Sequence, residues 1–244
     1  MDENIKNPLA TENISKLLLK FSVPTMFTLM VSYLYNIVDQ IFVGKGVGII
    51  GIAATNISFP FTIVCNSFAL LIGDGCAANI SLCLGRKEQK QANAYFGNAF
   101  SILILFGILI VILSYIFLEK LLLICGATQS ILPFAKDYTT IILLGLPFMM
   151  FNVSFTAIIR CDGNPKYSMK AMLIGAVINI ILDPIFIFIL DMGVKGAAIA
   201  TILGQFVSGM ICICYIFKFQ NITFEKQNMI LKPSTSISIF LLGI

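Results

Sequence analysis

Long apolar runs alternate with short polar connections along most of the chain. Six of these runs are long enough to cross a membrane as helices, because about 20 apolar residues span the hydrocarbon core. We predict the spans at residues 21–43, 53–84, 96–117, 138–159, 168–190 and 194–217. The second run is long for one span, which indicates a helix that is tilted or extends beyond the bilayer. The pattern predicts an all-α integral membrane protein, built as a six-transmembrane-helix bundle.

The polar segments divide the chain into four parts. Residues 1–20 form a polar amino-terminal lead, residues 21–217 the six-helix lobe and residues 218–236 a polar linker. Residues 237–244 are apolar again, but eight helical residues reach only ~12 Å. We therefore expect them to be the truncated start of a seventh helix. Between the third and fourth spans, residues 118–137 are semi-polar and predict a short helix on the membrane surface.

Composition agrees with a membrane protein. The chain is 58% hydrophobic and 11% charged, whereas soluble domains average about 45–50% apolar and about 25% charged residues. Twelve of the 16 Lys and Arg residues fall in one alternating set of connections and four in the other. The positive-inside rule then predicts a protein of the cell membrane whose amino terminus and linker lie on the cytoplasmic side. The lipid bilayer is the expected partner, and no feature suggests nucleic acid.

Cysteine and histidine usage excludes two kinds of site. The seven cysteines include no CxxC pair, and histidine is absent. A disulfide framework or a zinc site is therefore not expected. We expect the cysteines to pack as small apolar residues, and we predict no cofactor.

The stretch from Asn179 to Pro184, with the sequence NIILDP, places polar groups inside the fifth span. Asn179 and Asp183 are four residues apart, so they share one face of a helix. Pro184 has no N–H group and leaves the carbonyl of Ile180 without its helical partner. A carboxylate at this depth is costly and by default indicates an ion or substrate path. We therefore predict a cation or proton site here.

Asp39 is a second acid, toward the outer end of the first span. Tyr35 and Asn36 precede it by four and three residues and can share its helical face. Asp39 alone has two interpretations, a site residue or a residue in water at the outer interface. Asp183 is expected in the same outer half of the bilayer. If the two carboxylates face each other, desolvation and repulsion favour binding of a proton, or of a cation such as Na⁺ with Asn179 as a neutral ligand.

Two further patterns favour packing over chemistry. Asp74 is flanked by glycines in the inner part of the second span, which indicates an interfacial acid beside a close helix contact. Gly196, Ala200 and Gly204 are four residues apart in the sixth span, a spacing typical of closely packed membrane helices. Thr201 on that span could offer a hydroxyl to the interior.

Four prolines lie inside predicted spans: Pro24, Pro60, Pro147 and Pro184. Bent helices near an ionisable site are typical of transporters, although membrane helices also tolerate proline without a functional role. We predict that Pro24 and Pro184 are helix-bending positions.

Four segments together resemble the multidrug and toxic compound extrusion (MATE) transporters. They are YLYNIVDQIFVG in the first span, RCDGNPKYSM at the turn before the fifth, INIILDPIFIF within it, and MGVKGAAIATILGQ in the sixth. Their order and spacing are similar to the amino-terminal lobe of that family, and the match covers residues 15–217.

The resemblance implies one lobe of a twelve-helix transporter with two six-helix lobes around a central cavity. It implies that Asp39, Asn179, Asp183 and Thr201 match residues of a buried cation or proton site. It also implies that Pro24 matches a proline at which the first helix is proposed to bend. The second lobe is absent from this chain, so its partner would be that lobe or a second copy of this one.

These expectations point to a membrane transporter and not an enzyme. The expected function is a secondary active antiporter that exports amphipathic or cationic drugs or metabolites in exchange for H⁺ or Na⁺. One alternative is a lipid-linked oligosaccharide flippase, although no basic residue lies mid-membrane to hold its pyrophosphate. A second is an inactive truncated half-transporter. A third, an intramembrane aspartyl protease, lacks the Tyr-Asp pair at Asp39 and the full Gly-x-Gly-Asp motif at Asp74.

Overall fold

The computed structural model describes residues 13–243, except for the side chains of Leu17 and Lys226, so residues 1–12 of the predicted polar lead and Ile244 of the predicted seventh helix lie outside the description. Six long helices are α2 (Ile14–Gly46), α3 (Ile49–Gly85), α4 (Gln89–Ile116), α6 (Leu132–Cys161), α7 (Pro165–Pro184) and α8 (Gly193–Cys214). Within the described range, these six segments are long and apolar enough to cross a membrane. The predicted six-helix membrane bundle is confirmed, and the second span is one continuous helix.

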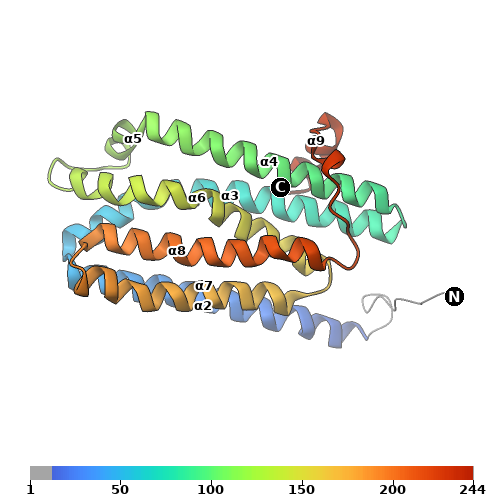
Figure 1. Ribbon diagram of the computed structural model, residues 1–244, viewed down its shortest axis with the longest axis horizontal. Helices are drawn as coiled ribbons and strands as arrows, with labels where there is room; N and C mark the ends of the chain where they lie inside the picture. The colour runs from blue at the N-terminus through green and yellow to red at the C-terminus, as the bar shows by residue number, and fades with distance from the viewer. Residues whose placement is uncertain (1–12, 244) are drawn as a thin grey trace.

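The long helices lie roughly antiparallel, side by side along the long axis of the molecule (Figure 1). α6 lies at the centre, where it packs mainly against α3 and α8. α8 packs against α7, and α7 against α2, so α2 forms one edge of the bundle. The short helix α5 (Leu118–Ile124) lies at one end, after α4, where a short helix was predicted. Because α2 contacts α3 only slightly, it leaves a long apolar face uncovered by the bundle.

The connection between α6 and α7 contains the residue types that are typical of turns and helix starts. At the turn between α6 and α7, Gly163 has φ +95°, a conformation that glycine adopts without steric cost. The side chain of Asn164 then caps α7 by accepting a hydrogen bond from the N–H of Tyr167, at 3.2 Å. Pro165 occupies the first helical turn, where its missing N–H needs no partner.

Pro184 is the last residue of α7, but the helical conformation does not end there. The chain continues into a five-residue π-helix, η1 (Ile185–Ile189), and the N–H of Leu190 bonds to the carbonyl of Ile185 at 2.9 Å. A wider π-turn is a common way for membrane helices to accommodate a proline. Pro24, in contrast, lies within the unbroken helix α2. There the hydroxyl of Thr28 donates a hydrogen bond to the carbonyl of Pro24 at 2.7 Å.

The small-residue face predicted on the sixth span packs closely, as expected. Gly196 and Ala200 are buried, with Gly196 facing the backbone of Phe186. A β-carbon added to Gly204 would lie 2.7 Å from the carbonyl oxygen of Gly175 on α7. α7 and α8 therefore cross at a distance that only these glycines permit.

Replacing Gly175 by alanine is expected to lower the stability of the chain by about 1–3 kcal/mol. The new methyl group would lie 2.7 Å from the carbonyl oxygen of Gly204 and 2.8 Å from Cβ of Ser208, so the two helices would have to separate. Thermal unfolding of the detergent-solubilised chain, followed by fluorescence size-exclusion chromatography, measures the shift. Gly85→Ala is the matched control, because no atom lies within 4 Å of the added carbon. Equal midpoints for the two variants would contradict the close crossing.

The polar linker runs across one end of α4 as an ordered segment, which we call the strap (residues 219–232). The side-chain carbonyl of Asn93 accepts a hydrogen bond from the N–H of Thr223 at 3.0 Å. The side-chain carbonyl of Asn98 accepts a hydrogen bond from the backbone N–H of Lys232 at 2.8 Å. Buried asparagines on α4 thus satisfy backbone groups of a segment that has little regular structure of its own.

After the strap, α9 (Pro233–Gly243) packs against α3. Asn79 of α3 donates a hydrogen bond to the carbonyl of Ser238 at 3.2 Å, and Gly75 lies against the backbone of Ile239. The helix begins at Pro233, ahead of the predicted start at residue 237. Proline at the first helical position favours an early start, because its φ angle is already helical.

Candidate functional site

Asp39 and Asp183, predicted on separate spans, come together inside the bundle. α2 and α7 pack side by side, and the two side-chain carboxyl groups lie close enough to interact with each other. Asp39 is 6% exposed and Asp183 is fully buried. Asp39 is therefore buried inside the bundle and is not a solvated residue at the interface.

Asn179 and Thr201 complete the predicted group. The amide of Asn179 donates a hydrogen bond to Oδ1 of Asp183 at 3.2 Å and lies 3.5 Å from Oγ1 of Thr201 on α8. Asn179 is 3% exposed. Three helices, α2, α7 and α8, thus bring all four predicted residues to one place. We call this group the carboxylate site: Asp39, Asn179, Asp183 and Thr201.

Three neighbours of the carboxylate site were missed by the sequence analysis. Gln40 donates a hydrogen bond to Oδ2 of Asp39 at 3.3 Å, and its own carbonyl accepts one from Thr55 of α3 at 3.2 Å. The buried phenol of Tyr138 on α6 is close enough to the carboxyl groups of Asp39 and Asp183 to interact with them electrostatically. Gln40 adjoins Asp39 in the sequence and could have been noticed, but nothing in the local sequence around Thr55 or Tyr138 points to this contact.

Asn36 does not share the face of Asp39, contrary to the sequence-based interpretation. It is exposed, and its amide donates to the carbonyl of Ser32 at 2.7 Å. Tyr35, in contrast, turns inward and lines a small cavity beside Asn179. Both spacings permit a shared helical face, so the packing of α2 against the other helices decides that Tyr35, and not Asn36, reaches the interior.

The site is short of hydrogen-bond donors. Oδ1 of Asp39, Oδ1 of Asn179 and Oδ2 of Asp183 are buried and have no hydrogen-bond partner in the described chain. The ion pairs that described residues form with one another lie elsewhere: Lys136–Glu119, Arg160–Asp74 and Lys195–Asp137. Two neighbouring buried carboxylates are unfavourable unless a positive charge or a proton accompanies them. The arrangement can therefore take up a cation or a proton between the two acids.

The donor set suits a hard monovalent cation better than a transition metal. No group of three or more His, Cys, Asp or Glu side chains in the part of the chain described could hold a metal ion. The carboxylate site supplies only oxygen ligands from two acids, one amide and one hydroxyl, which hard cations prefer.

Asp74 does not join the carboxylate site. Its side chain is 53% exposed and lies 3.7 Å from Arg160 of α6. The flanking Gly73 and Gly75 pack against Ser154 and Ile239, as expected for a close helix contact. Asp74 is therefore a peripheral acid, and the protease motif has no counterpart in the geometry.

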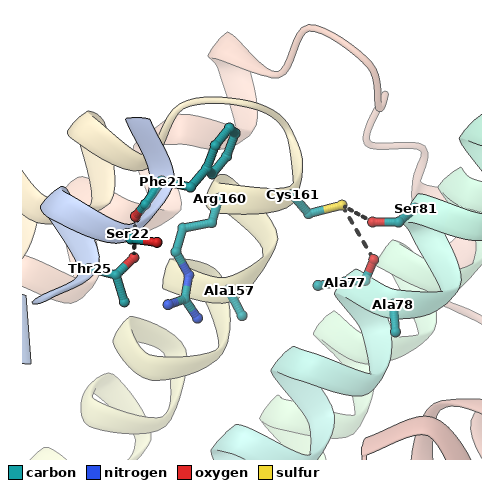
Figure 2. A pocket seen from close by; sticks show the side chains of 9 residues that line it. All are labelled: Phe21, Ser22, Thr25, Ala77, Ala78, Ser81, Ala157, Arg160 and Cys161. Atoms are coloured by element: carbon teal, nitrogen blue, oxygen red, sulfur yellow. Dashed lines mark hydrogen bonds between the residues drawn. The ribbon is translucent and has the colours of Figure 1, made fainter. Parts of the chain in front are cut away.

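A larger hollow of about 490 Å³ lies between α2, α3 and α6, toward the amino-terminal end of α2. Figure 2 shows Arg160 and Cys161 of α6 on its wall, opposite Thr25 of α2. The thiol of Cys161 donates to the carbonyl of Ala77 at 3.3 Å and lies 3.0 Å from Oγ of Ser81. None of the predicted site residues lines this hollow.

Known proteins resemble this chain both in sequence and in the arrangement of their helices. The profile of the MatE family matches residues 24–185. The multidrug export protein MepA of Staphylococcus haemolyticus is 31% identical over 236 residues, which are 95% of this chain and 52% of that protein. The probable multidrug resistance protein YoeA of Bacillus subtilis is 25% identical over 92% of this chain and 50% of its own length.

Solved structures agree. A crystal structure of MATE in the bent conformation superposes with a TM-score of 0.86 at 27% identity, over 94% of this chain and 51% of that one. An outward-facing MATE transporter gives 0.87 at 27% identity, over 97% and 52%. The chain thus spans about half the length of the relatives it matches. It belongs to the MatE family, a family of membrane transporters and not of enzymes.

Proposed function

We propose that the chain forms the ion-coupling lobe of a secondary active antiporter. The antiporter exports amphipathic or cationic drugs or metabolites in exchange for H⁺ or Na⁺. The observation that supports this most directly is the carboxylate site, where two buried acids lie close together and some of their oxygens lack a hydrogen-bond partner. Such a site changes its charge and its hydrogen bonding when a cation enters or leaves. The drug-export names of the similar proteins support the choice of cargo.

In the proposed mechanism, ion binding is transmitted to α2. Pro184 follows Asp183 directly, and the π-helix after it contacts the outer part of α2. The rings of Phe42 and Phe188 meet there at 6.1 Å, and Gly46 lies against Ile187. Binding of a cation draws Asp39 and Asp183 together, and we propose that α2 then shifts and bends at Pro24. Few neighbours resist this, since only 6% of the α2 membrane segment is buried.

The energetics allow one ion per cargo molecule. One elementary charge moved through 100 mV supplies about 2.3 kcal/mol. A tenfold gradient of a neutral cargo requires about 1.4 kcal/mol. A single coupling site in one lobe is therefore sufficient.

We propose that the chain lies in the cell membrane with its amino terminus and the strap on the cytoplasmic side. The excess of Lys and Arg at that end supports this. The chain spans about half the length of the relatives it matches, and we propose that a second lobe or a second copy of this lobe packs against it.

The proposal is tested by the ion dependence of efflux. Cells that lack other drug exporters express the chain and are loaded with ethidium. We expect energised efflux that stops when the proton gradient, or the sodium gradient, is collapsed by an ionophore specific for that ion. Efflux that persists when both gradients are collapsed contradicts ion coupling, and retention equal to that of cells without the chain contradicts transport by it.

A further inference from the structure

A small polar cavity adjoins Asn179 and Thr201 of the carboxylate site. Its volume is about 30 Å³, and residues of α2, α6, α7 and α8 line it. Its polar lining residues are Tyr35, Asn152, Asn179, Thr201, Gln205 and Ser208. Inside a membrane bundle, so many polar groups around one space are costly unless they are hydrogen-bonded.

Several of these groups have no protein partner. Oδ1 of Asn179, Oε1 of Gln205 and Oγ of Ser208 are buried and without a hydrogen bond in the described chain. Asn179 is 3% exposed and Ser208 is 2% exposed. A polar cavity of this size holds one or two water molecules, each of which satisfies two to four polar neighbours. The lining therefore has both the room and the partners that buried water requires.

The helices cannot close the space by themselves. Gly175 and Gly204 line the cavity and already bring α7 and α8 to their closest approach. Neither glycine has a side chain to fill the gap, and a β-carbon on either would clash. The cavity is thus held open next to a contact that cannot tighten.

The polar lining of the cavity extends along α8. Along α8, Thr201 and Ser208 are seven residues apart, which is about 10 Å. Ser208 lies toward the end of α8 that leads into the strap, the proposed cytoplasmic end (Figure 1). Beyond it, the thiol of Cys212 donates to Oδ1 of Asn152 at 3.5 Å, so polar contacts continue in that direction.

We propose that this cavity holds ordered water and gives protons an internal route between the carboxylate site and the cytoplasmic half of the lobe. An O–H bond of a carboxyl group breaks as one to water forms, and the carboxylate remains behind. A proton passes along hydrogen-bonded water, whereas a hard cation such as Na⁺ keeps a shell of oxygen ligands and needs more space than one or two waters leave. The route rests on the proposed function and selects H⁺ as the coupling ion.

Radiolytic hydroxyl-radical footprinting of the full chain in lipid nanodiscs tests the water directly. Met172 lines the cavity, and radicals form on the water beside it. Met150, which is fully buried and lies outside the cavity lining, is the internal reference. Met172 is itself half-buried, so the test is the change that the variant causes. In the double variant Gln205→Met and Ser208→Ala, which keeps the side-chain sizes similar, oxidation of Met172 relative to Met150 should fall several-fold.

Ser168→Ala is the matched control. Ser168 is also 2% exposed, but its hydroxyl donates to the carbonyl of Pro165 at 2.9 Å, away from the cavity. Its footprint should equal that of the wild type. Equal oxidation of Met172 and Met150 in the wild type, or oxidation that persists in the double variant, overturns the water site.

Proton movement is then measured with a dye trapped in vesicles that contain the chain, driven by an ethidium gradient. The double variant should slow it about tenfold, equivalent to about 1.4 kcal/mol on the barrier, while Ser168→Ala leaves it unchanged. An unchanged rate in the double variant overturns the route but leaves the proposed function standing, provided that Asp183→Asn abolishes movement. A wild type that moves no protons in response to ethidium overturns the route, whatever the footprint. It overturns the proposed function as well only if ethidium drives no sodium movement either.

Discussion

Asp183→Asn is expected to abolish ion-coupled efflux, with a loss of at least about 100-fold in coupled rate, which corresponds to about 2.7 kcal/mol. Asparagine has nearly the same shape, and its carbonyl can still accept the hydrogen bond from Asn179. The fold should therefore survive. The variant, however, can neither bind a proton at this position nor attract a cation with a negative charge. Because Asp183 is fully buried, bulk solvent cannot take over its role.

Ethidium resistance and efflux in intact cells measure this loss. Asp191→Asn is the control, because it makes the same chemical change at an exposed residue with φ +50°, where asparagine is well tolerated. Membrane levels of both variants should equal that of the wild type. If Asp39 and Asp183 act as one unit, the double variant with Asp39→Asn should be no worse than Asp183→Asn alone. Normal efflux by Asp183→Asn would remove the carboxylate site from the mechanism.

Asp162→Ala is expected to lower the stability of the chain by about 2–4 kcal/mol. Asp162 lies in the turn between α6 and α7 and is 1% exposed. Its carboxylate accepts hydrogen bonds from the hydroxyl of Tyr215 at 2.9 Å and from the backbone N–H groups of Gln220 and Asn221 at 3.1 and 2.9 Å. Alanine leaves all these donors without an acceptor, and the strap loses its anchor at the end of α8.

Two measurements detect this loss. The thermal midpoint of the purified chain should fall, and limited trypsin digestion should cut after Lys218, directly before the strap, earlier than it cuts the helices. Asp162→Asn should lie between the wild type and alanine, because one oxygen remains to accept. Asp74→Ala is the control, since Asp74 is half exposed and has a single ion pair at 3.7 Å. Equal stability of Asp162→Ala and Asp74→Ala would show that the strap is held by its apolar contacts instead.

The helices were predictable because a membrane span needs only length and apolar composition. The second run, continuous through Pro60, is one helix from Ile49 to Gly85. Boundaries were less accurate, since helices extend past the apolar core with polar residues. The first helix starts at Ile14 instead of residue 21, and the third at Gln89 instead of residue 96. Hydropathy locates the membrane and not the end of the hydrogen-bonded helix.

The sequence by itself determined the six spans and the packing face on the sixth, and it pointed to Asp39, Asn179 and Asp183 through their spacing and the high cost of a charge in lipid. Thr201 was singled out by the family resemblance. Only the tertiary structure decided that the two carboxyl groups lie close together, that Tyr138 and Thr55 lie nearby, and that Asn36 faces outward. It also decided that Gln205 and Ser208 share a cavity with Asn179. Such contacts join distant segments through the crossing of helices, and no local sequence pattern encodes the angle or distance at which two helices cross.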